Sequence, residues 1–308
     1  MTAMQSATAV RDPKTSGIID VPNVAVYRQV GPVPPHVFVA ERDRALSPAT
    51  ESGLIDLDLS KILGTDYPAT TPLLLCRYVV IRRGEEVRHS LRATGEVYFV
   101  IRGSGSSIGP DGTRLAWSAG DVFCFPGSGT TRHRATGNGD ALLYQATDEP
   151  ALSYLRLNPP TPDHAPVLAA HFSAREIDKH LASIHEKNER HQGAGKAVIF
   201  YTEPMAYMRT MLPAMNIGVN SLEPGGDQRP HRHNSIAVTL AVESEGVHSL
   251  VDGQKVPWER FAAFITPPGA VHSHHVATGS PGDMRAFVIQ DGGLHYYCRT
   301  GMFQYADA

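Results

Sequence analysis

The chain contains 308 residues and has a formal net charge of −3, from 28 lysines and arginines and 31 aspartates and glutamates. This length accommodates about two domains with hydrophobic cores of their own, and the charge balance excludes the basic field that nucleic acids or anionic membranes attract. No segment reaches the ~18 apolar residues that cross a bilayer, and residues 1–6 lack a secretion signal. The three cysteines have no metal-type spacing, so we expect a cytoplasmic protein with reduced thiols.

The first 70 residues are rich in proline and weakly patterned, which predicts a tail and an arm that wraps a neighbouring surface. Four short segments beyond this arm are rich in apolar and β-branched residues and are predicted to be strands. These strands are Leu73–Ile81, Val97–Ile101, Val122–Phe125 and Ala141–Gln145.

A linker helix is predicted after these strands. Ser173 and, three residues later, Glu176 form a capping box. Ile177, Leu181 and Ile184 then recur at helical spacing within a polar run. The helix is expected to extend to about Gln192.

Strands are predicted again in the second half of the chain. They are Ala197–Tyr201, Asn216–Leu222, Ser235–Val242, His248–Val251, Ala262–Ile265 and Arg285–Gln290. Helices and strands do not alternate as they do in parallel α/β proteins. The pattern therefore favours closed or sandwiched antiparallel sheets.

The segment Pro230-His231-Arg232-His233 predicts a metal site. Side chains alternate between the two faces of a strand, so His231 and His233 point the same way and Arg232 points to the other face. His272, which follows a Pro-Pro-Gly corner, is expected to join them from a later strand. Three imidazoles leave open positions on a divalent metal, as catalytic sites require. An HxH pair by itself is more often a surface accident, but the two parts together resemble the signature of the cupin superfamily.

An internal repeat supports this interpretation. A shift of about 142 positions aligns the two halves, and a one-residue gap continues the register. The aligned pairs are Gly84 with Gly226, His89 with His231, Leu91 with His233, Glu96 with Val238, Asp111-Gly112 with Asp252-Gly253, Pro126 with Pro267, Thr131 with His272 and His133 with His274. We therefore expect an all-β bicupin, with two double-stranded β-helix (jelly-roll) barrels and a short linker helix.

The first barrel has one histidine at the three ligand positions, so it is predicted to be a degenerate cupin that packs against its partner. A site built from His89, Glu96 and His133 is the alternative. The expected domains are an arm at 1–70, a first cupin at 71–155, a linker at 156–195 and a second cupin at 196–308. Packing through strands and arms predicts a homo-oligomer, a dimer or a tetramer.

The second half resembles the gentisate and salicylate type of ring-cleaving dioxygenases, which are bicupins. The resemblance is carried by Pro230-His231-Arg232-His233 and by Thr266-Pro267-Pro268 leading into His272-Ser273-His274. It implies that His231, His233 and His272 bind Fe(II). It also implies that His274 is the acid/base or the hydrogen-bonding group beside the substrate.

Two departures from that family concern the location of the site and the contacts to the substrate. The family commonly has its metal in the N-terminal cupin, and it places an arginine beyond the HxH pair, where this chain reads Asn234–Thr239. Arg229, or an arginine of the first half, is expected to bind the substrate carboxylate instead. Gln290 and Asp291 lie near the place of a polar group that faces the substrate in the family.

The resemblance implies a non-haem iron dioxygenase of the extradiol type, which uses O₂ to open the ring of a gentisate or a substituted salicylate. Val238, where a glutamate ligand could stand, argues against the His₃Glu set of manganese cupins. Imidazole ligation nevertheless leaves nickel, copper, manganese and zinc open. Two other functions fit the patterns: a metal-dependent oxidase of another small chelating metabolite, such as a diketone or an amine, and a non-catalytic cupin that binds metal or a small molecule.

Overall fold

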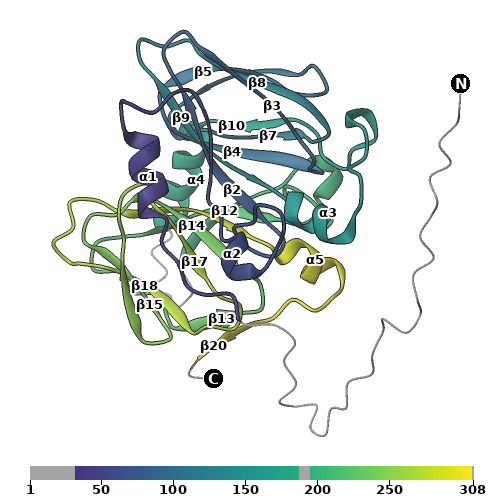
Figure 1. The fold of residues 1–308 in the computed structure, drawn as a ribbon. Coiled ribbons are helices and arrows are strands. Elements are labelled where there is room, and N and C mark those ends of the chain that lie inside the picture. The colour runs from purple at the N-terminus through teal and green to yellow at the C-terminus, as the bar shows by residue number, and fades with distance from the viewer. Residues whose placement is uncertain (1–31, 187–194, 307–308) are drawn as a thin grey trace, which may run out of the picture. The chain divides into compact units, whose positions relative to one another are not determined.

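Antiparallel strands dominate the computed structural model, which describes residues 32–186 and 195–306 (Figure 1). In the first half the strands are β1 Gly53–Asp56, β2 Leu75–Ile81, β3 Glu86–Leu91, β4 Gly95–Arg102, β5 Ser104–Ile108, β6 Arg114–Ser118, β7 Val122–Pro126, β8 Gly129–Ala135, β9 Ala141–Thr147 and β10 Ala170–Phe172. In the second half they are β11 Lys196–Phe200, β12 Asn216–Leu222, β13 His231–His233, β14 Ala237–Glu243, β15 Val247–Val251, β16 Gln254–Pro257, β17 Ala263–Thr266, β18 His272–Val276, β19 Met284–Gln290 and β20 Phe303–Tyr305.

Each half forms two sheets. The first has a six-stranded sheet in the order β1-β2-β9-β4-β7-β10 and a four-stranded sheet in the order β3-β8-β5-β6. The second has two five-stranded sheets, β11-β12-β19-β14-β17 and β16-β15-β18-β13-β20. All of the strand pairs are antiparallel, which confirms the all-β bicupin fold predicted from the repeat.

The larger sheets explain why several strands are apolar without interruption. Strand β4 is buried on both faces: Val97 and Phe99 belong to the core cluster between the barrels, whereas Tyr98 and Val100 belong to the interior of the first barrel. Across the interface the rings of Phe99 and Phe287 stack with centroids 5.1 Å apart. A strand that is buried on both faces cannot alternate between apolar and polar residues.

The helices are short. They are α1 Val39–Leu46, α2 Ser60–Leu63, α3 Glu149–Leu155, α4 Ala174–Glu186 and α5 Gly292–Tyr297, with 3₁₀ turns at Pro162–His164 and Glu203–Met205. Helix α4 is the predicted linker helix, and the hydroxyl of Ser173 accepts the backbone N–H of Glu176 at 3.3 Å as the capping box requires. Its expected extension to Gln192 lies outside the described residues. None of the described helices is long and apolar enough to cross a membrane.

The segment before the first barrel contacts both barrels. The backbone N–H of Phe38 donates to Ala263 at 2.8 Å, at the edge of the second barrel. Further along, β1 pairs with β2 of the first barrel. The domain limits expected at residues 70, 155 and 195 stay a prediction. The sheets extend beyond them, because β1 and β10 form the outer strands of the six-stranded sheet.

Candidate metal centre

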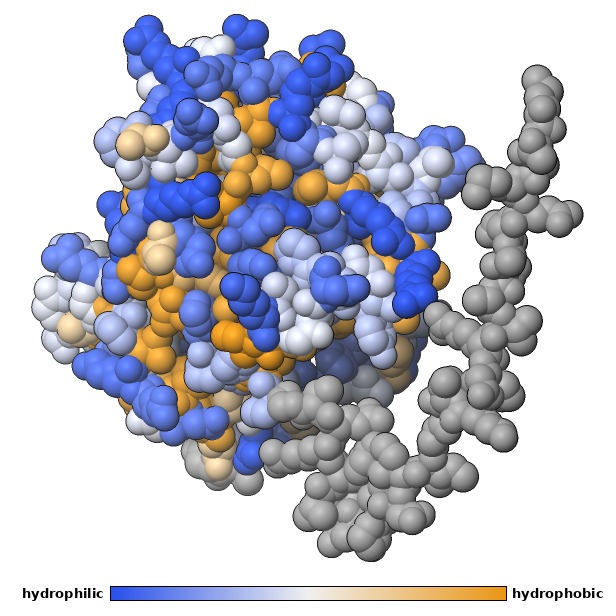
Figure 2. Space-filling model, viewed as in Figure 1, coloured by the Kyte–Doolittle hydropathy of each residue, from blue (hydrophilic) through white to orange (hydrophobic). Residues whose placement is uncertain are grey.

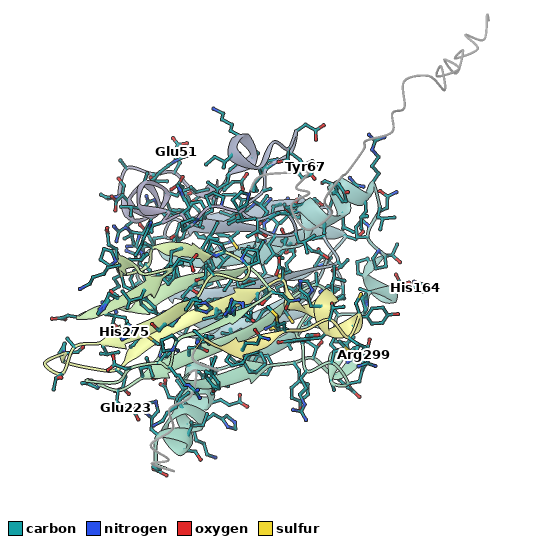
Figure 3. The ribbon with its side chains drawn as sticks, turned by 90° about the horizontal axis from the view of Figure 1, so that it is seen from below. Glu51, Tyr67, His164, Glu223, His275 and Arg299 are labelled. Atoms are coloured by element: carbon teal, nitrogen blue, oxygen red, sulfur yellow. The ribbon has the colours of Figure 1, made fainter. Side chains whose placement is uncertain are left out.

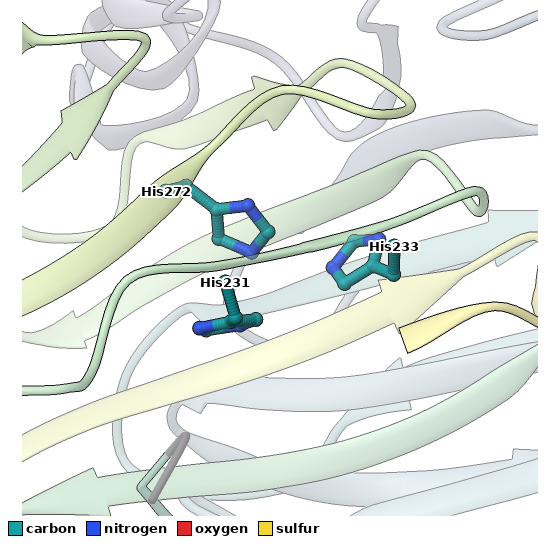
Figure 4. Close-up of side chains that lie close together, drawn as sticks. All are labelled: His231, His233 and His272. Carbon is teal, nitrogen blue, oxygen red and sulfur yellow. The ribbon is translucent and has the colours of Figure 1, made fainter. Parts of the chain in front are cut away.

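Three histidines converge inside the second barrel (Figure 4). The antiparallel pairing of β13 and β18 places His231 directly opposite His272. Alternation along β13 turns His233 to the same side as His231. All three side chains are buried, and they offer one nitrogen each within 4.8 Å of the others. The structure thus brings together the three residues that the sequence predicts as metal ligands.

Backbone carbonyl groups fix the tautomer of each of these imidazoles. His231 Nδ1 lies 3.0 Å from the carbonyl oxygen of Arg229, and His233 Nδ1 lies 2.8 Å from that of Ser235. His272 Nδ1 lies 3.0 Å from the carbonyl oxygen of Ala270. A carbonyl oxygen only accepts, so each Nδ1 carries the proton and each Nε2 keeps a lone pair. Hydrogen bonds of this kind orient histidine ligands in metal sites.

Burial also keeps these imidazoles neutral. Loss of hydration lowers the pKa of His231 and of His233 below the usual 6.5. For His272, burial and the neighbouring His231 lower the pKa to about 3. Only a neutral imidazole has a lone pair for a metal. The donor set is therefore ready to bind a cation at neutral pH, and the residues fit the metal that the motifs imply.

The three histidines line a cavity of about 550 Å³. Its lining residues all belong to the second half of the chain, so the first barrel contributes no wall to it. Part of the wall is apolar, with Val288, Met302 and Phe303. Phe303, on β20, stacks on the His231 ring with centroids 5.0 Å apart. The volume suits a small aromatic molecule.

His274 also lines this cavity, whereas His275 does not. The ring of His274 lies 6.2 Å from that of His272 between centroids. Burial, followed by the nearby His272, lowers the pKa of His274 well below its usual range. His275 instead contacts Asp227 at 2.5 Å and Ser273 at 2.8 Å. The alternation expected from the sequence is thus present in the structure.

The three residues expected near the substrate have different surroundings. Gln290 lines the cavity, and its amide nitrogen lies 3.2 Å from His233 Nε2. Asp291 accepts the backbone N–H of Ile236 at 2.7 Å, and burial raises its pKa to about 6. The guanidinium of Arg229 lies 4.0 Å from the centroid of the Tyr305 ring. Neither Asp291 nor Arg229 is a lining residue.

Sequence reasoning missed Arg299. Among the residues that the structure describes, it is the one arginine or lysine that lines the cavity. It follows α5, and Figure 3 shows it beside the yellow C-terminal segment, far from His275 in that view. No motif surrounds it in the sequence. The pairing of β20 with β13, which brings the C-terminal segment beside His231 and His233, could have drawn attention to it.

The first barrel fills the equivalent positions with hydrogen bonds. Glu96 is fully buried, and its carboxylate accepts the hydroxyls of Tyr98 and Thr131, the latter at 2.9 Å. His89 Nε2 lies 3.2 Å from the same carboxylate. Within residues 32–186 and 195–306, His231, His233 and His272 form the only group of three close metal-binding side chains. His89, Glu96 and His133 therefore do not form the alternative site.

Part of the chain is similar in sequence to curated dioxygenases. It is 37% identical over 86 residues to a 5-aminosalicylate 1,2-dioxygenase of Comamonas sp, an alignment that covers 28% of this chain and 22% of that protein. It is 41% identical over 61 residues to a gentisate 1,2-dioxygenase of Ralstonia sp, covering 20% of this chain and 17% of the relative. The alignments thus span less than a quarter of either relative. No family model matches the chain.

The fold is similar over nearly the whole chain to a solved structure. The salicylate 1,2-dioxygenase of Pseudaminobacter salicylatoxidans superimposes with a TM-score of 0.74 at 14% identity, covering 97% of this chain and 94% of that one. A mutant of a salicylate 1,2-dioxygenase in complex with gentisate gives a TM-score of 0.71, with 91% of this chain and 88% of the other covered. The chain therefore has a bicupin fold, and its predicted resemblance to gentisate and salicylate 1,2-dioxygenases is confirmed.

Proposed function

We propose that this bicupin is an Fe(II)-dependent dioxygenase that uses O₂ to open the ring of a hydroxylated aromatic acid. The observation that carries the proposal is the set of three buried, neutral imidazoles with their Nε2 atoms in one cavity of about 550 Å³. The relatives support the substrate class. Their names describe action on 5-aminosalicylate, gentisate and 5-nitrosalicylic acid, all of which are hydroxybenzoates.

His231, His233 and His272 would hold the metal. Bound there, Fe(II) would supply open positions for O₂ and for two oxygens of an anionic chelating substrate. The ligands are neutral, and Val238 is buried where many cupins place a glutamate ligand. Since no carboxylate reduces the charge of the ion, the donor set favours an anionic substrate.

The chain's other cavity residues would orient the substrate. Arg299 can form a bidentate ion pair with a carboxylate, a role for which Arg229 was expected from the sequence. His274 would hold a hydroxyl or move its proton, since imidazole serves both purposes. The apolar side chains of Val288 and Phe303 would cover the ring faces and exclude water.

The position of cleavage follows from the names of the relatives. In a salicylate, position 1 bears the carboxylate and position 2 bears the hydroxyl, so a 1,2-dioxygenase opens the bond between these two carbons. The term extradiol describes cleavage beside two neighbouring hydroxyls. For this chain we propose cleavage between the carbon that bears the carboxylate and the carbon that bears the hydroxyl. One O₂ would be consumed for each ring opened.

We also propose that the protein is a homo-oligomer. Large apolar side chains are exposed, among them Tyr154, Tyr207 and Tyr297, each more than 65% accessible. Figure 2 shows apolar residues, in orange, grouped among hydrophilic ones on one face. Apolar surface of this kind is often covered by a second copy. Light scattering at several protein concentrations tests this, and a monomer at every concentration would contradict it.

The test of the activity is oxygen uptake by the protein loaded anaerobically with Fe(II). Gentisate, salicylate, 5-aminosalicylate and 5-nitrosalicylate are added in turn while the aromatic absorbance is followed. We expect uptake of O₂ together with loss of the aromatic band for at least one of them. Uptake without loss of the band would favour oxidation of another metabolite, and tight binding with no uptake would favour a non-catalytic cupin.

A further inference from the structure

A chain of two hydrogen bonds leads from the barrel wall to the cavity. The indole Nε1 of Trp258 lies 2.7 Å from Ser249 Oγ, and the same Oγ lies 2.7 Å from His274 Nδ1. Ser249 is fully buried, and His274 is the only one of the three that lines the cavity. The Nδ1 atom of His274 thus contacts Ser249 in the barrel wall, and its Nε2 atom is left to contact a molecule in the cavity.

The direction of these hydrogen bonds follows from what each group can donate. The indole has a donor and no acceptor, so Trp258 donates to Ser249. Within the described parts of the chain, the hydroxyl of Ser249 has no other partner than Trp258 and His274. If His274 donated from Nδ1, the buried hydroxyl hydrogen of Ser249 would have no acceptor, at a cost in free energy. The satisfied arrangement has Ser249 donate to Nδ1, and the His274 proton is then on Nε2.

The first barrel contains the same three residues at the repeat-related positions. Trp117 Nε1 lies 2.7 Å from Ser107 Oγ, and this oxygen lies 2.6 Å from His133 Nδ1. There His133 Nε2 is buried and has no hydrogen-bond partner among the residues that the structure describes. The motif therefore forms in the barrel without a metal site. What distinguishes the second copy is that its histidine faces a cavity with three metal-type ligands.

We propose that Ser249 and Trp258 are positioning residues that fix the His274 tautomer, so that its Nε2–H donates a hydrogen bond to an anionic oxygen of the molecule bound in the cavity. This assigns His274 one of the two roles left open above, that of donor. The tautomer follows from the hydrogen bonds alone, and only the identity of the acceptor, a phenolate or carboxylate oxygen, rests on the proposed function.

The tautomer is measured directly by ¹⁵N NMR of the histidine rings in the metal-free full chain, with His274 and His133 assigned by substitution. We expect His274 to carry its proton on Nε2 in the wild type, and Ser249→Ala to produce a mixture of tautomers. Ser107→Ala is the matched control, which should change His133 and leave His274 as it is. A wild-type proton on Nδ1, or an unchanged His274 in Ser249→Ala, would overturn the proposal.

Kinetics add a second measurement with gentisate as the probe. Ser249→Ala is expected to lose about tenfold in kcat/KM at unchanged metal content, the loss typical of residues that orient a site. Ser249→Thr keeps the hydroxyl and should recover the wild-type kcat/KM. The kcat/KM of Ser107→Ala should stay within about twofold of the wild type. An equal loss in Ser107→Ala would show that the effect is only structural. Failure of the wild type to consume O₂ would contradict the proposed function while the tautomer result stands.

Discussion

The two barrels differ at the positions that face their interiors and agree at those that build the fold. In the second barrel β13 and β18 set His231 opposite His272. In the first, β3 and β8 set His89 opposite Thr131 in the same arrangement. The second barrel gathers three imidazole nitrogens around one cavity, whereas the first barrel binds its His89 Nε2 and the Tyr98 hydroxyl to the Glu96 carboxylate. The barrel thus forms with or without the three histidines, and the proposed metal chemistry depends on a few inward residues.

The largest effect is expected when one of the three histidines of the second barrel is replaced. His231→Ala, His233→Ala or His272→Ala should each abolish stoichiometric metal binding and oxygen uptake, because two imidazoles do not replace three. His89→Ala, at the position equivalent to His231, should leave both nearly intact. Elemental analysis of the four purified variants measures this. An equal loss of metal in His89→Ala would show that the first barrel binds metal too.

The next effect separates catalysis from metal binding. His274→Ala should keep the metal and lower turnover by roughly 10²-fold or more, as expected for a lost hydrogen-bonding or proton-transfer group. His275→Ala is the control, since that ring faces Asp227 outside the cavity. Metal content and oxygen uptake are measured on both. A fully active, metal-replete His274→Ala protein would remove this residue from the mechanism.

A smaller effect concerns the carboxylate of the substrate. Arg299→Gln should raise KM by about 10- to 100-fold with little change in kcat, because an ion-paired hydrogen bond contributes about 1.5–3 kcal/mol. Arg229→Gln is the matched comparison, and it should change KM less because Arg229 does not line the cavity. Steady-state kinetics of the two variants decide between them. A larger KM increase in Arg229→Gln would restore the assignment made from the sequence.

The sequence predicted the strands that are apolar on both faces. It also predicted that His231, His233 and His272 converge, because alternate residues of a strand point to the same side. It missed strands such as β3 and β8, whose buried residues include the polar His89, Thr131 and His133. It also missed Arg299 and Phe303. Phe303 reaches the cavity through the pairing of β20 with β13, a contact between segments some 70 residues apart that local patterns do not encode, and Arg299 lies between α5 and β20.

The register of the repeat aligned His133 with His274, but it did not single out Ser107 and Ser249. Their significance needed three-dimensional information. A serine opposite a histidine is informative only when the hydrogen bond, the indole behind it and the cavity in front are seen together. Inward polar residues are thus the part of a barrel that a hydrophobic pattern describes least.

A further prediction tests the first barrel as a purely structural unit. Glu96→Gln should lower the free energy of unfolding by about 1–3 kcal/mol, because the buried hydroxyls of Tyr98 and Thr131 lose a charged acceptor. Metal content and turnover should not change. Glu86→Gln, on the exposed face of β3, is the control and should stay within about 0.5 kcal/mol. Denaturant unfolding measures the difference, and loss of metal in Glu96→Gln would contradict a structural role.

The smallest expected effect is the pH dependence of metal binding. Protons compete with the metal for an imidazole, and the competition begins where pH approaches the pKa of that imidazole. Burial lowers the pKa of His231 and His233 below 6.5 and that of His272 to about 3. Lowering the pH from 8 to 6.5 should therefore weaken zinc binding by less than about twofold for each histidine, since half-protonation comes only at the pKa. The zinc should be released at lower pH, where the imidazoles become protonated. Competition with a chelator measures the zinc affinity, with a short His-x-His peptide of ordinary pKa as the control, and a fall as steep as that of the peptide would show that burial does not protect the ligands.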